Sequence, residues 1–258
     1  MKICTFNLRK NCDKGLQSFR KRFPLVKVFF EKEAPDITGF QEVMPRPLKK
    51  LARNLKDYEF YGVGRMAGNK EESVPIAWKK DKFTCLDKGT FWLSDTPDVP
   101  GSKAFDCYWP RICSWVKLQS EEGVLLVYNV HLDHRSEPAR QLGTKLVKEH
   151  MAKNVISDKV GLMIMGDFNV FPDSDVVAKM AEPFVNADDV NVALKDITEN
   201  LEYSYQGYGL EARKEKIDYI YVSEGLKAEG PSYLYEYINE KGTYISDHFP
   251  VLVNVEKA

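Results

Sequence analysis

The sequence has no excess of basic residues and no long apolar run. Its 37 Lys and Arg residues are balanced by 38 Asp and Glu residues, which leaves a formal charge of −1. Nucleic-acid-binding proteins usually carry a basic excess because they must neutralise phosphates, so this balance disfavours that class, although a local basic cleft would be compatible with it. No apolar run approaches the roughly 20 residues that cross a bilayer, and Met1–Arg9 lacks the apolar core of a signal peptide. We therefore expect a cytoplasmic protein without a membrane span.

Cysteine and histidine are also scarce. The five cysteines form an odd number, contain no CxxC pair and have no histidine at zinc-finger spacing. We therefore predict reduced thiols in core or loop positions. Hydrophobic residues, in contrast, make up 43% of the chain, enough for a large core. Because no repeat or linker-like tract divides the sequence, we predict one domain over residues 1–258.

Short apolar segments alternate with helical patterns along the chain. Helices are expected in a segment that contains Leu25 and Phe29 and stops at Pro35, after Pro47, and after the capping residue Ser136. Ten strands are expected, at Lys2–Asn7, Ile37–Val43, Tyr58–Val63, Pro75–Trp78, Phe83–Leu86, Ile112–Leu118, Val124–His131, Gly161–Met165, Ile217–Val222 and Val251–Val255. The stretch between residues 58 and 128 indicates an antiparallel sheet, and the continuous apolar run at 161–165 is typical of a strand covered on both faces. The pattern favours packed sheets with helices outside.

Polar side chains that are costly to bury stand mostly at the ends of these strands. They are Asn7, Glu42, His131, Asp167, Asn169, Asp218, Asp247 and His248. A carboxylate at such a position is partly removed from water, which costs several kcal/mol unless a cation or hydrogen bonds compensate. A strand end also holds a side chain more firmly than a mobile loop does.

This mixture of side chains favours a hard divalent cation. Carboxylate and amide oxygens suit Mg²⁺, whereas a zinc site would favour His or Cys at fixed spacing. Three of the four histidines fall in the strand-end segments, and the fourth, His150, is expected on a helix at the surface or core edge. An imidazole beside a carboxylate can serve as a general base near pH 7. Metal, carboxylate and imidazole together predict hydrolysis of a phosphate ester.

Six motifs occur in a fixed order between Asn7 and His248: TFNLR, GFQEV, YNVHLDHRS, IMGDFN, KIDYIYVS and SDHFPV. In this order they resemble the endonuclease/exonuclease/phosphatase superfamily, which includes apurinic-site endonucleases, inositol-polyphosphate phosphatases and deadenylases. The resemblance covers nearly the whole chain and suggests a bacterial-type member. It implies an α/β fold, a four-layer α/β/β/α sandwich of two packed mixed, mainly antiparallel sheets, with the site at one edge of the paired sheets.

The resemblance also implies metal ligands. Glu42 would be the principal ligand of Mg²⁺, with Mn²⁺ as a substitute, assisted by Asn7 and by Asp247 through the metal or its waters. His248 would be the base or the imidazole that polarises the phosphate, and a hydrogen bond to Asp218 would fix its tautomer.

Three further roles follow from the same resemblance. Asp167 would orient or activate the attacking water, and Asn169 would hold the phosphate and the nucleophile. His131 would face the charge that develops on phosphorus or on the leaving group; some relatives have a tyrosine there. Whether one or two metals act stays open.

Substrate contacts are predicted outside these motifs. Arg9 and Arg111 could bind phosphate, because a guanidinium donates paired hydrogen bonds to it. Each could equally be an ordinary surface arginine, because these are common. Trp109 could form a wall of the substrate site. Specificity is expected to depend on three loops, Gly64–Ser73, Ser94–Arg111 and Ala187–Arg213.

Three functions compete on these observations. The leading one is a Mg²⁺-dependent hydrolase of a small phosphorylated molecule, such as a sugar or lipid head-group phosphate. A nuclease or deadenylase would share the chemistry but would need a basic groove, for which Arg20–Arg22 and Lys49–Lys50 are the candidate segments. A non-catalytic binding domain of the same fold is the third, although none of its eight expected catalytic and metal-binding positions is lost.

Overall fold

Two β-sheets pack face to face in the structure, a computed structural model that describes residues 1–155, 160–210, 212 and 214–258. The first sheet has the order β13 (Leu226–Ala228), β15 (Val251–Lys257), β1 (Lys2–Asn7), β2 (Ile37–Gln41), β4 (Ile76–Lys79) and β3 (Tyr58–Tyr61), with β14 (Tyr233–Leu234) also paired to β15. The second has the order β11 (Leu194–Asp196), β12 (Asp218–Ser223), β8 (Gly161–Asp167), β7 (Gly123–His131), β6 (Ile112–Ser120) and β5 (Thr84–Trp92). A short ribbon joins β9 (Phe184–Val185) and β10 (Asn191–Val192). The pairs β1–β2 and β7–β8 run parallel and the other pairs antiparallel, so both sheets are mixed and mainly antiparallel.

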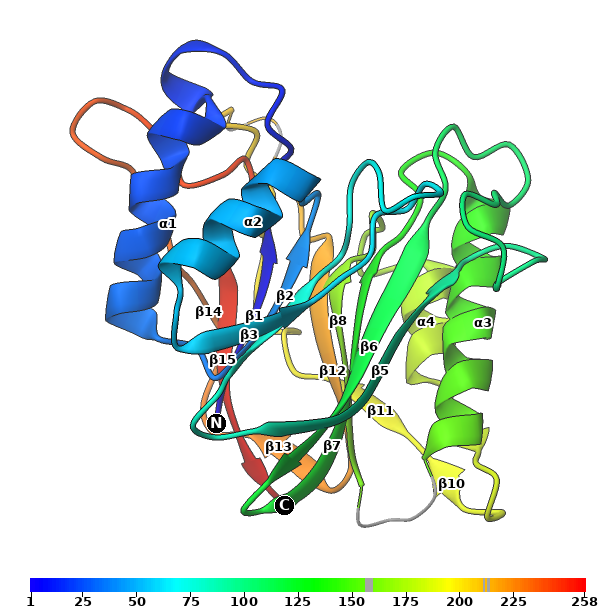
Figure 1. Cartoon of the computed structure of the whole chain (residues 1–258). Helices are drawn as coiled ribbons and strands as arrows, with labels where there is room; N and C mark the ends of the chain where they lie inside the picture. Colours follow the sequence, from blue (N-terminus) through cyan, green and yellow to red (C-terminus); the bar gives the residue numbers. More distant parts are fainter. Residues whose placement is uncertain (156–159, 211, 213) are drawn as a thin grey trace.

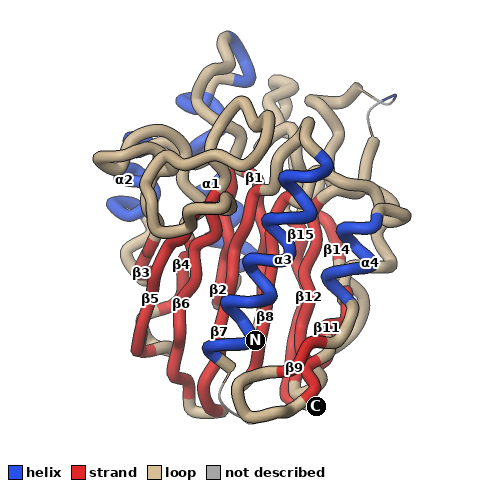
Figure 2. Tube along the Cα trace, turned by 90° about the vertical axis from the view of Figure 1, so that its right-hand side faces the viewer, coloured by secondary structure: helices blue, strands red, loops and turns tan. Residues whose placement is uncertain are grey.

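Helices cover the outer faces of both sheets (Figure 1). A single 3₁₀ turn, η1 (Gly15–Gln17), precedes α1 (Phe19–Glu33), which lies with α2 (Pro45–Asn54) over the first sheet. On the other side, α3 (Glu137–Asn154) and α4 (Asp175–Ala181) lie over the second sheet, as Figure 2 shows face-on. The predicted four-layer α/β/β/α arrangement is confirmed. Both termini lie at the edge of the sheets opposite the end of β1 (Figure 1).

Three hydrophobic cores fill the three gaps between the layers. Strand β8 shows how one strand serves two of them. Leu162 and Ile164 enter the core beneath α3 and α4, whereas Met163 and Met165 enter the core between the sheets. Because side chains alternate across a strand, a strand with both faces covered must be apolar at every position, as predicted for this segment.

Most predicted strands and helices are present, with shifted ends. Strand β2 ends at Gln41 rather than at Val43, because Glu42 has a left-handed backbone with φ of 59°. Helix α2 begins at Pro45, two residues before the predicted Pro47, since proline is well suited to a first helical position. Strand β5 is more than twice as long as predicted, and its exposed polar residues hide it from a hydrophobic pattern.

The stretch between residues 58 and 128 is divided between the sheets. Strands β3 and β4 belong to the first sheet, and β5, β6 and β7 belong to the second. The prediction of antiparallel pairing is right within each sheet, but a single sheet over this stretch is wrong. The sequence analysis did not predict helix α4 or the short strands β9 to β11, β13 and β14.

The cysteines behave as predicted. All five are free thiols: Cys4, Cys107 and Cys113 are buried, Cys85 is partly buried and Cys12 is exposed. Among the helices of the described residues, none combines the length and apolar character that crossing a membrane requires.

Candidate active site

Strand register gathers the predicted polar residues at one edge of the paired sheets. In the second sheet, Asp167 at the end of β8 lies opposite His131 of β7 and Asp218 of β12. In the first sheet, Asn7 at the end of β1 lies opposite Gln41, the residue before Glu42. A cavity of about 380 Å³ opens here, and Glu42, His131, Asp167, Asn169, Asp247 and His248 line it. Asn7 and Asp218 are buried, and each is hydrogen-bonded to a lining residue.

The backbone is strained where it enters this cavity. Arg9, Glu42 and Asn169 each follow a strand by one or two residues and have φ values of 55°, 59° and 52°. Residues other than glycine rarely adopt this left-handed backbone conformation, and those that do are concentrated at functional sites. Gly166 precedes Asp167 with φ of 147°, and a Cβ there would lie 2.1 Å from the carbonyl oxygen of Val130. Only glycine fits so close to the neighbouring backbone, and this close packing at the end of β8 fixes the position of Asp167.

Asp167 is the centre of the hydrogen-bond network. Its Oδ2 accepts from the Asn7 amide at 2.9 Å and lies 3.6 Å from Nε2 of His131 and 3.8 Å from Nε2 of His248. Burial raises the pKa of Asp167 to about 7, and the Asp218 carboxylate contributes in the same direction. A carboxylate with this pKa can accept a proton near neutral pH.

His248 is held by the neighbouring strand. Its Nδ1 lies 2.7 Å from Oδ2 of Asp218, which leaves Nε2 on the side of Asp167 and the cavity. Burial opposes the charge on the imidazole, but Asp218, with Asp167 and Asp247 as further carboxylates, raises the pKa of His248 to about 10. These carboxylates therefore favour the protonated, cationic form of the imidazole. The predicted pairing of His248 with Asp218 is present.

His131 has the opposite electrostatic setting. Burial, and then the charges of Arg111 and Arg65, lower its pKa well below the ordinary value, so the imidazole is neutral. Asn169, which lines the same cavity, donates from its side-chain amide to the carbonyl of Leu132 at 3.0 Å. The backbone N–H of Asn169 in turn donates to Oδ1 of Asp167. These contacts fix Asn169 beside the central carboxylate.

Two carboxylates, Glu42 and Asp247, face the cavity from the first-sheet side. Burial, and in addition the Glu42 carboxylate, raises the pKa of Asp247, although His248 and Arg9 act against this. Arg9 lies 3.5 Å from Asp247 and offsets only part of the negative charge. Like charges held together in a buried place suit an added cation. This donor set therefore fits a hard divalent metal.

The amide of Asn7 is already engaged in this arrangement. Its nitrogen donates to Asp167 and, at 3.3 Å, to Oε1 of Glu42, while its oxygen accepts from the backbone N–H of Arg9. Asn7 thus joins the two carboxylates directly. In this orientation the side-chain nitrogen of Asn7, and not its oxygen, points toward the two carboxylates. For Asn7 to serve as the predicted metal ligand, its side-chain amide would have to rotate by half a turn and exchange the positions of O and N.

A second set of metal-ligand atoms also occurs here. One atom from each of Asp167, Asp218 and His248 lies within 4.8 Å of the others. The contact between His248 and Asp218 engages Nδ1 of the ring and Oδ2 of the carboxylate, so two of these three side chains already pair with each other. Glu42 and Asp247 face the open cavity and remain our candidate ligands.

The three predicted substrate residues, Arg9, Trp109 and Arg111, all line the cavity. Arg111 is buried and joins Oδ2 of Asp133, at 3.2 Å from its Nε, to Nδ1 of His134, at 2.9 Å from its Nη2. Sequence reasoning missed several further lining residues, among them Lys10, Arg65, Glu72 and Glu215. Arg65 and Glu72 come from the first of the three loops expected to set specificity. Of the third loop, Tyr205 lines the cavity, and residues 211 and 213 lie outside the described residues.

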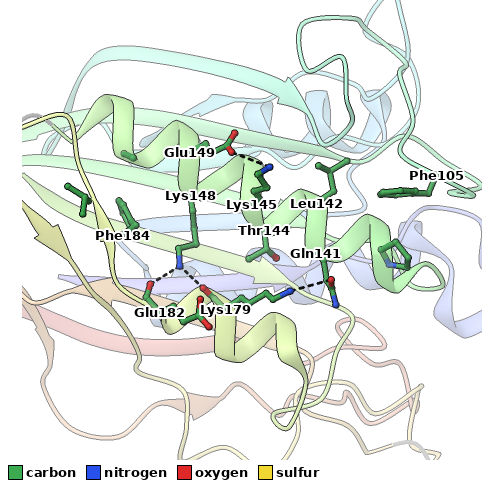
Figure 3. Close-up of a pocket in the computed structure, with 13 residues that line it drawn as sticks. Phe105, Gln141, Leu142, Thr144, Lys145, Lys148, Glu149, Lys179, Glu182 and Phe184 are labelled. Atoms are coloured by element: carbon green, nitrogen blue, oxygen red, sulfur yellow. Dashed lines mark hydrogen bonds and ion pairs between the residues drawn. The ribbon is translucent and has the colours of Figure 1, made fainter. Parts of the chain in front are cut away.

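A larger cavity of about 690 Å³ lies between α3 and α4, on the outside of the second sheet (Figure 3). Its polar groups pair with one another: Lys148 donates to the carbonyls of Lys179 and Glu182 at the end of α4, and Lys145 pairs with Glu149. These contacts tie the two helices together. The two carboxylates that line this groove, Glu149 and Glu182, are exposed, whereas Asp167 and Asp247 of the strand-end cavity are buried.

Comparisons with known proteins agree with this geometry. The model of the Endonuclease/Exonuclease/phosphatase family matches residues 4–248. An endonuclease/exonuclease/phosphatase from Bacteroides vulgatus is 27% identical, with a TM-score of 0.89 over 100% of this chain and 98% of that one. A mannosyl-6-phosphatase from Bacteroides thetaiotaomicron is 30% identical, with a TM-score of 0.85 over 99% of each chain. An uncharacterised protein of Acanthamoeba polyphaga mimivirus is 28% identical over 182 residues, which are 66% of this chain and 67% of that protein. The chain belongs to the endonuclease/exonuclease/phosphatase family, whose members are hydrolytic phosphoesterases and nucleases.

Proposed function

We propose that this protein is a magnesium-dependent phosphomonoesterase that acts on a small phosphorylated molecule, with sugar phosphates as the favoured class. The observation that carries the proposal is the position of Asp167, within 4 Å of two imidazoles and bonded to Asn7 beside Glu42. The similarity to a mannosyl-6-phosphatase over the whole chain supports the choice of a small substrate.

The metal would be held by Glu42 and Asp247, with Asn7 positioning Glu42. Bound there, Mg²⁺ would neutralise phosphate oxygens and lower the pKa of a coordinated water. The chain's own residues supply the remaining roles. Asp167 accepts the proton of the attacking water, as its pKa of about 7 allows.

The two histidines would bind the phosphate in different ways. His248, positively charged and fixed by Asp218, donates from Nε2 to a phosphate oxygen and stabilises the charge that builds up during attack. His131 is neutral, so it serves as a hydrogen-bond donor or acceptor near the leaving oxygen without adding charge. Asn169 keeps Asp167 in the orientation that this proton transfer requires.

The pairing of charges in the cavity wall supports a small substrate over a nucleic acid. Its four Arg and Lys residues, Arg9, Lys10, Arg65 and Arg111, are each close to a carboxylate. A polyanion needs unpaired cations along its path. Because these cations are already engaged, the wall is poorly suited to a chain of phosphates.

The proposal is tested with purified protein on p-nitrophenyl phosphate and bis(p-nitrophenyl) phosphate. We expect turnover of the monoester that requires Mg²⁺ or Mn²⁺ and stops with EDTA. EDTA-resistant turnover would contradict the metal role. Faster cleavage of the diester, together with salt-dependent retention of RNA or DNA, would favour the nuclease alternative.

A non-catalytic binding domain would give a different result. Magnesium would raise the melting temperature of the protein, but no phosphate ester in a broad panel would be hydrolysed. That combination would overturn the proposed function.

A further inference from the structure

A buried ion pair stands in the cavity wall beside the proposed metal site. Nη2 of Arg65 lies 3.0 Å from Oε1 of Glu72, and the two residues are only 3% and 7% exposed. The backbone N–H of Arg65 also donates to the carbonyl of Glu72, and the indole N–H of Trp92 donates to the carbonyl of Arg65. The loop is thus anchored at the position from which both side chains reach the cavity.

The surroundings complete a polar pocket around this pair. The guanidinium of Arg65 lies over the indole ring of Trp109, 4.9 Å from the centroid, and Nζ of Lys10 lies 3.8 Å from Oε1 of Glu72. Arg65, Glu72, Trp109 and Lys10 all line the same cavity as Asp167 and His248. They come from three separate segments, so the pocket is a product of the fold.

The ion pair is incompletely satisfied within the protein. Burial raises the pKa of Glu72 and lowers the pKa of Arg65, so each partner stabilises the other less than burial destabilises it. In the part of the chain that the structure describes, Nε of Arg65 has no hydrogen-bond partner. Such a pair is weak as a device for stability, which points to a role toward a ligand.

The charge pattern indicates what that ligand is. Glu72 faces two cations, Arg65 and Lys10, and Arg111 is occupied by Asp133. In this wall, as far as the structure describes it, hydrogen-bond donors and acceptors stand side by side, and each cation lies next to a carboxylate. A hydroxyl group both donates and accepts a hydrogen bond, so neighbouring hydroxyls match an adjacent carboxylate and guanidinium. The face of an indole ring suits the C–H face of a sugar ring.

We propose that Glu72, Arg65 and Trp109 form the specificity subsite for the alcohol part of the substrate, and that they select a polyhydroxylated one, such as a sugar. This inference rests on the proposed function, because it assumes that the phosphate is bound beside Asp167 and His248. The inference adds the residues that would contact the alcohol part of the substrate, beyond the phosphate group.

The test compares two classes of phosphate monoester, both formed from primary alcohols, that differ in the number of free hydroxyl groups. A panel of hexose 6-phosphates and pentose 5-phosphates is measured against butyl phosphate by phosphate release, with p-nitrophenyl phosphate as the check on chemistry. We expect the best sugar phosphate to exceed butyl phosphate at least tenfold in kcat/KM. In Glu72→Gln that ratio should fall at least tenfold, mainly through a higher KM for the sugar phosphate, since a hydrogen bond to a charged group is lost.

Two further variants keep the test decisive. Glu71→Gln makes the same chemical change one residue away, outside the cavity lining, and should keep the wild-type ratio. Trp109→Ala removes a partly exposed side chain, so the protein should fold even if Glu72→Gln does not, and the ratio should again fall.

The outcomes separate the two proposals. Magnesium-dependent turnover of p-nitrophenyl phosphate without a preference for sugar phosphates would overturn the subsite and leave the proposed function standing. Equal ratios in Glu72→Gln, Trp109→Ala and Glu71→Gln would also overturn it. Absence of turnover on every ester would overturn the proposed function, and the subsite with it.

Discussion

Two regions next to the second sheet each place a histidine beside buried groups, and they differ in what surrounds the ring. At the strand-end cavity, His248 touches Asp218 and lies near Asp167. On the outer face, His150 of α3 stacks on Phe91, with ring centroids 4.8 Å apart, and its Nδ1 lies 2.9 Å from the hydroxyl of Tyr128. The carboxylates raise the pKa of His248 to about 10, whereas burial lowers the pKa of His150 to about 4.

This contrast shows that burial alone does not decide whether a histidine is charged. His150 is a neutral ring that completes an aromatic cluster and links α3 to the sheet. His248 is kept charged by a carboxylate that is itself buried, an arrangement that costs free energy and that packing does not require. The four predictions that follow test this difference, from the largest expected effect to the smallest.

Replacing His248 should mainly reduce activity, whereas replacing His150 should mainly reduce stability. His248→Ala should reduce kcat on p-nitrophenyl phosphate about 10³-fold, within the usual range for loss of a positioned acid–base or charged group. His150→Ala should leave kcat within twofold and lower the melting temperature, because it opens space in the aromatic cluster. Steady-state kinetics and thermal unfolding of both variants provide the check. Comparable losses of kcat in the two variants would show that the contrast is wrong.

The hydrogen-bond partner of each histidine offers a finer comparison. Asp218→Asn removes the charge that holds His248 but keeps the side-chain shape, so we expect kcat to fall about 10²-fold. Tyr128→Phe removes the hydroxyl beside His150 and should leave kcat unchanged. The measurement is kcat at several pH values, since loss of Asp218 must also lower the pKa of His248. An Asp218→Asn enzyme with wild-type kcat and pH profile would argue against a positioning role.

Magnesium should stabilise only the strand-end region. At a concentration tenfold above Kd, a ligand that binds the folded state alone adds about 1.4 kcal/mol to the free energy of unfolding. This gain should disappear in Glu42→Gln and persist in Glu149→Gln, a matched change beside His150 on α3. Chemical denaturation with and without Mg²⁺ measures it. A gain that survives Glu42→Gln would place the metal elsewhere.

The smallest effect is the pH dependence that His150 contributes to stability. Its pKa is about 4 in the folded protein and near 6.5 when unfolded, so the unfolded chain takes up the proton first. The stabilising contribution is therefore complete above about pH 6.5 and is lost as the pH falls toward 4. In His150→Gln the free energy of unfolding should fall less steeply over this interval. Identical slopes in wild type and variant would show that His150 titrates normally.

The sequence predicts both the buried strands and the site residues because a charged side chain stands out next to a run of apolar residues. Strand β8 must be apolar on both faces, so Asp167 stands out at its end. The same reasoning identifies Asp218, which begins β12 next to a buried run. Motif order then indicated which strand ends meet. Strand β5 and helix α4 escaped detection because exposed or short elements leave no clear apolar pattern.

The residue types alone predicted the kind of site: Asp, Asn, Glu and His side chains at strand ends, where burial requires partners for hydrogen bonds and charge. The packing of the chain in space supplied what the residue pattern could not. It divided residues 58–128 between two sheets, and it placed Arg65, the ion-pair partner of Glu72, over the ring of Trp109. Contacts of this kind join loops through space, and no local periodicity encodes them because the packing of the two sheets sets the distance between the loops.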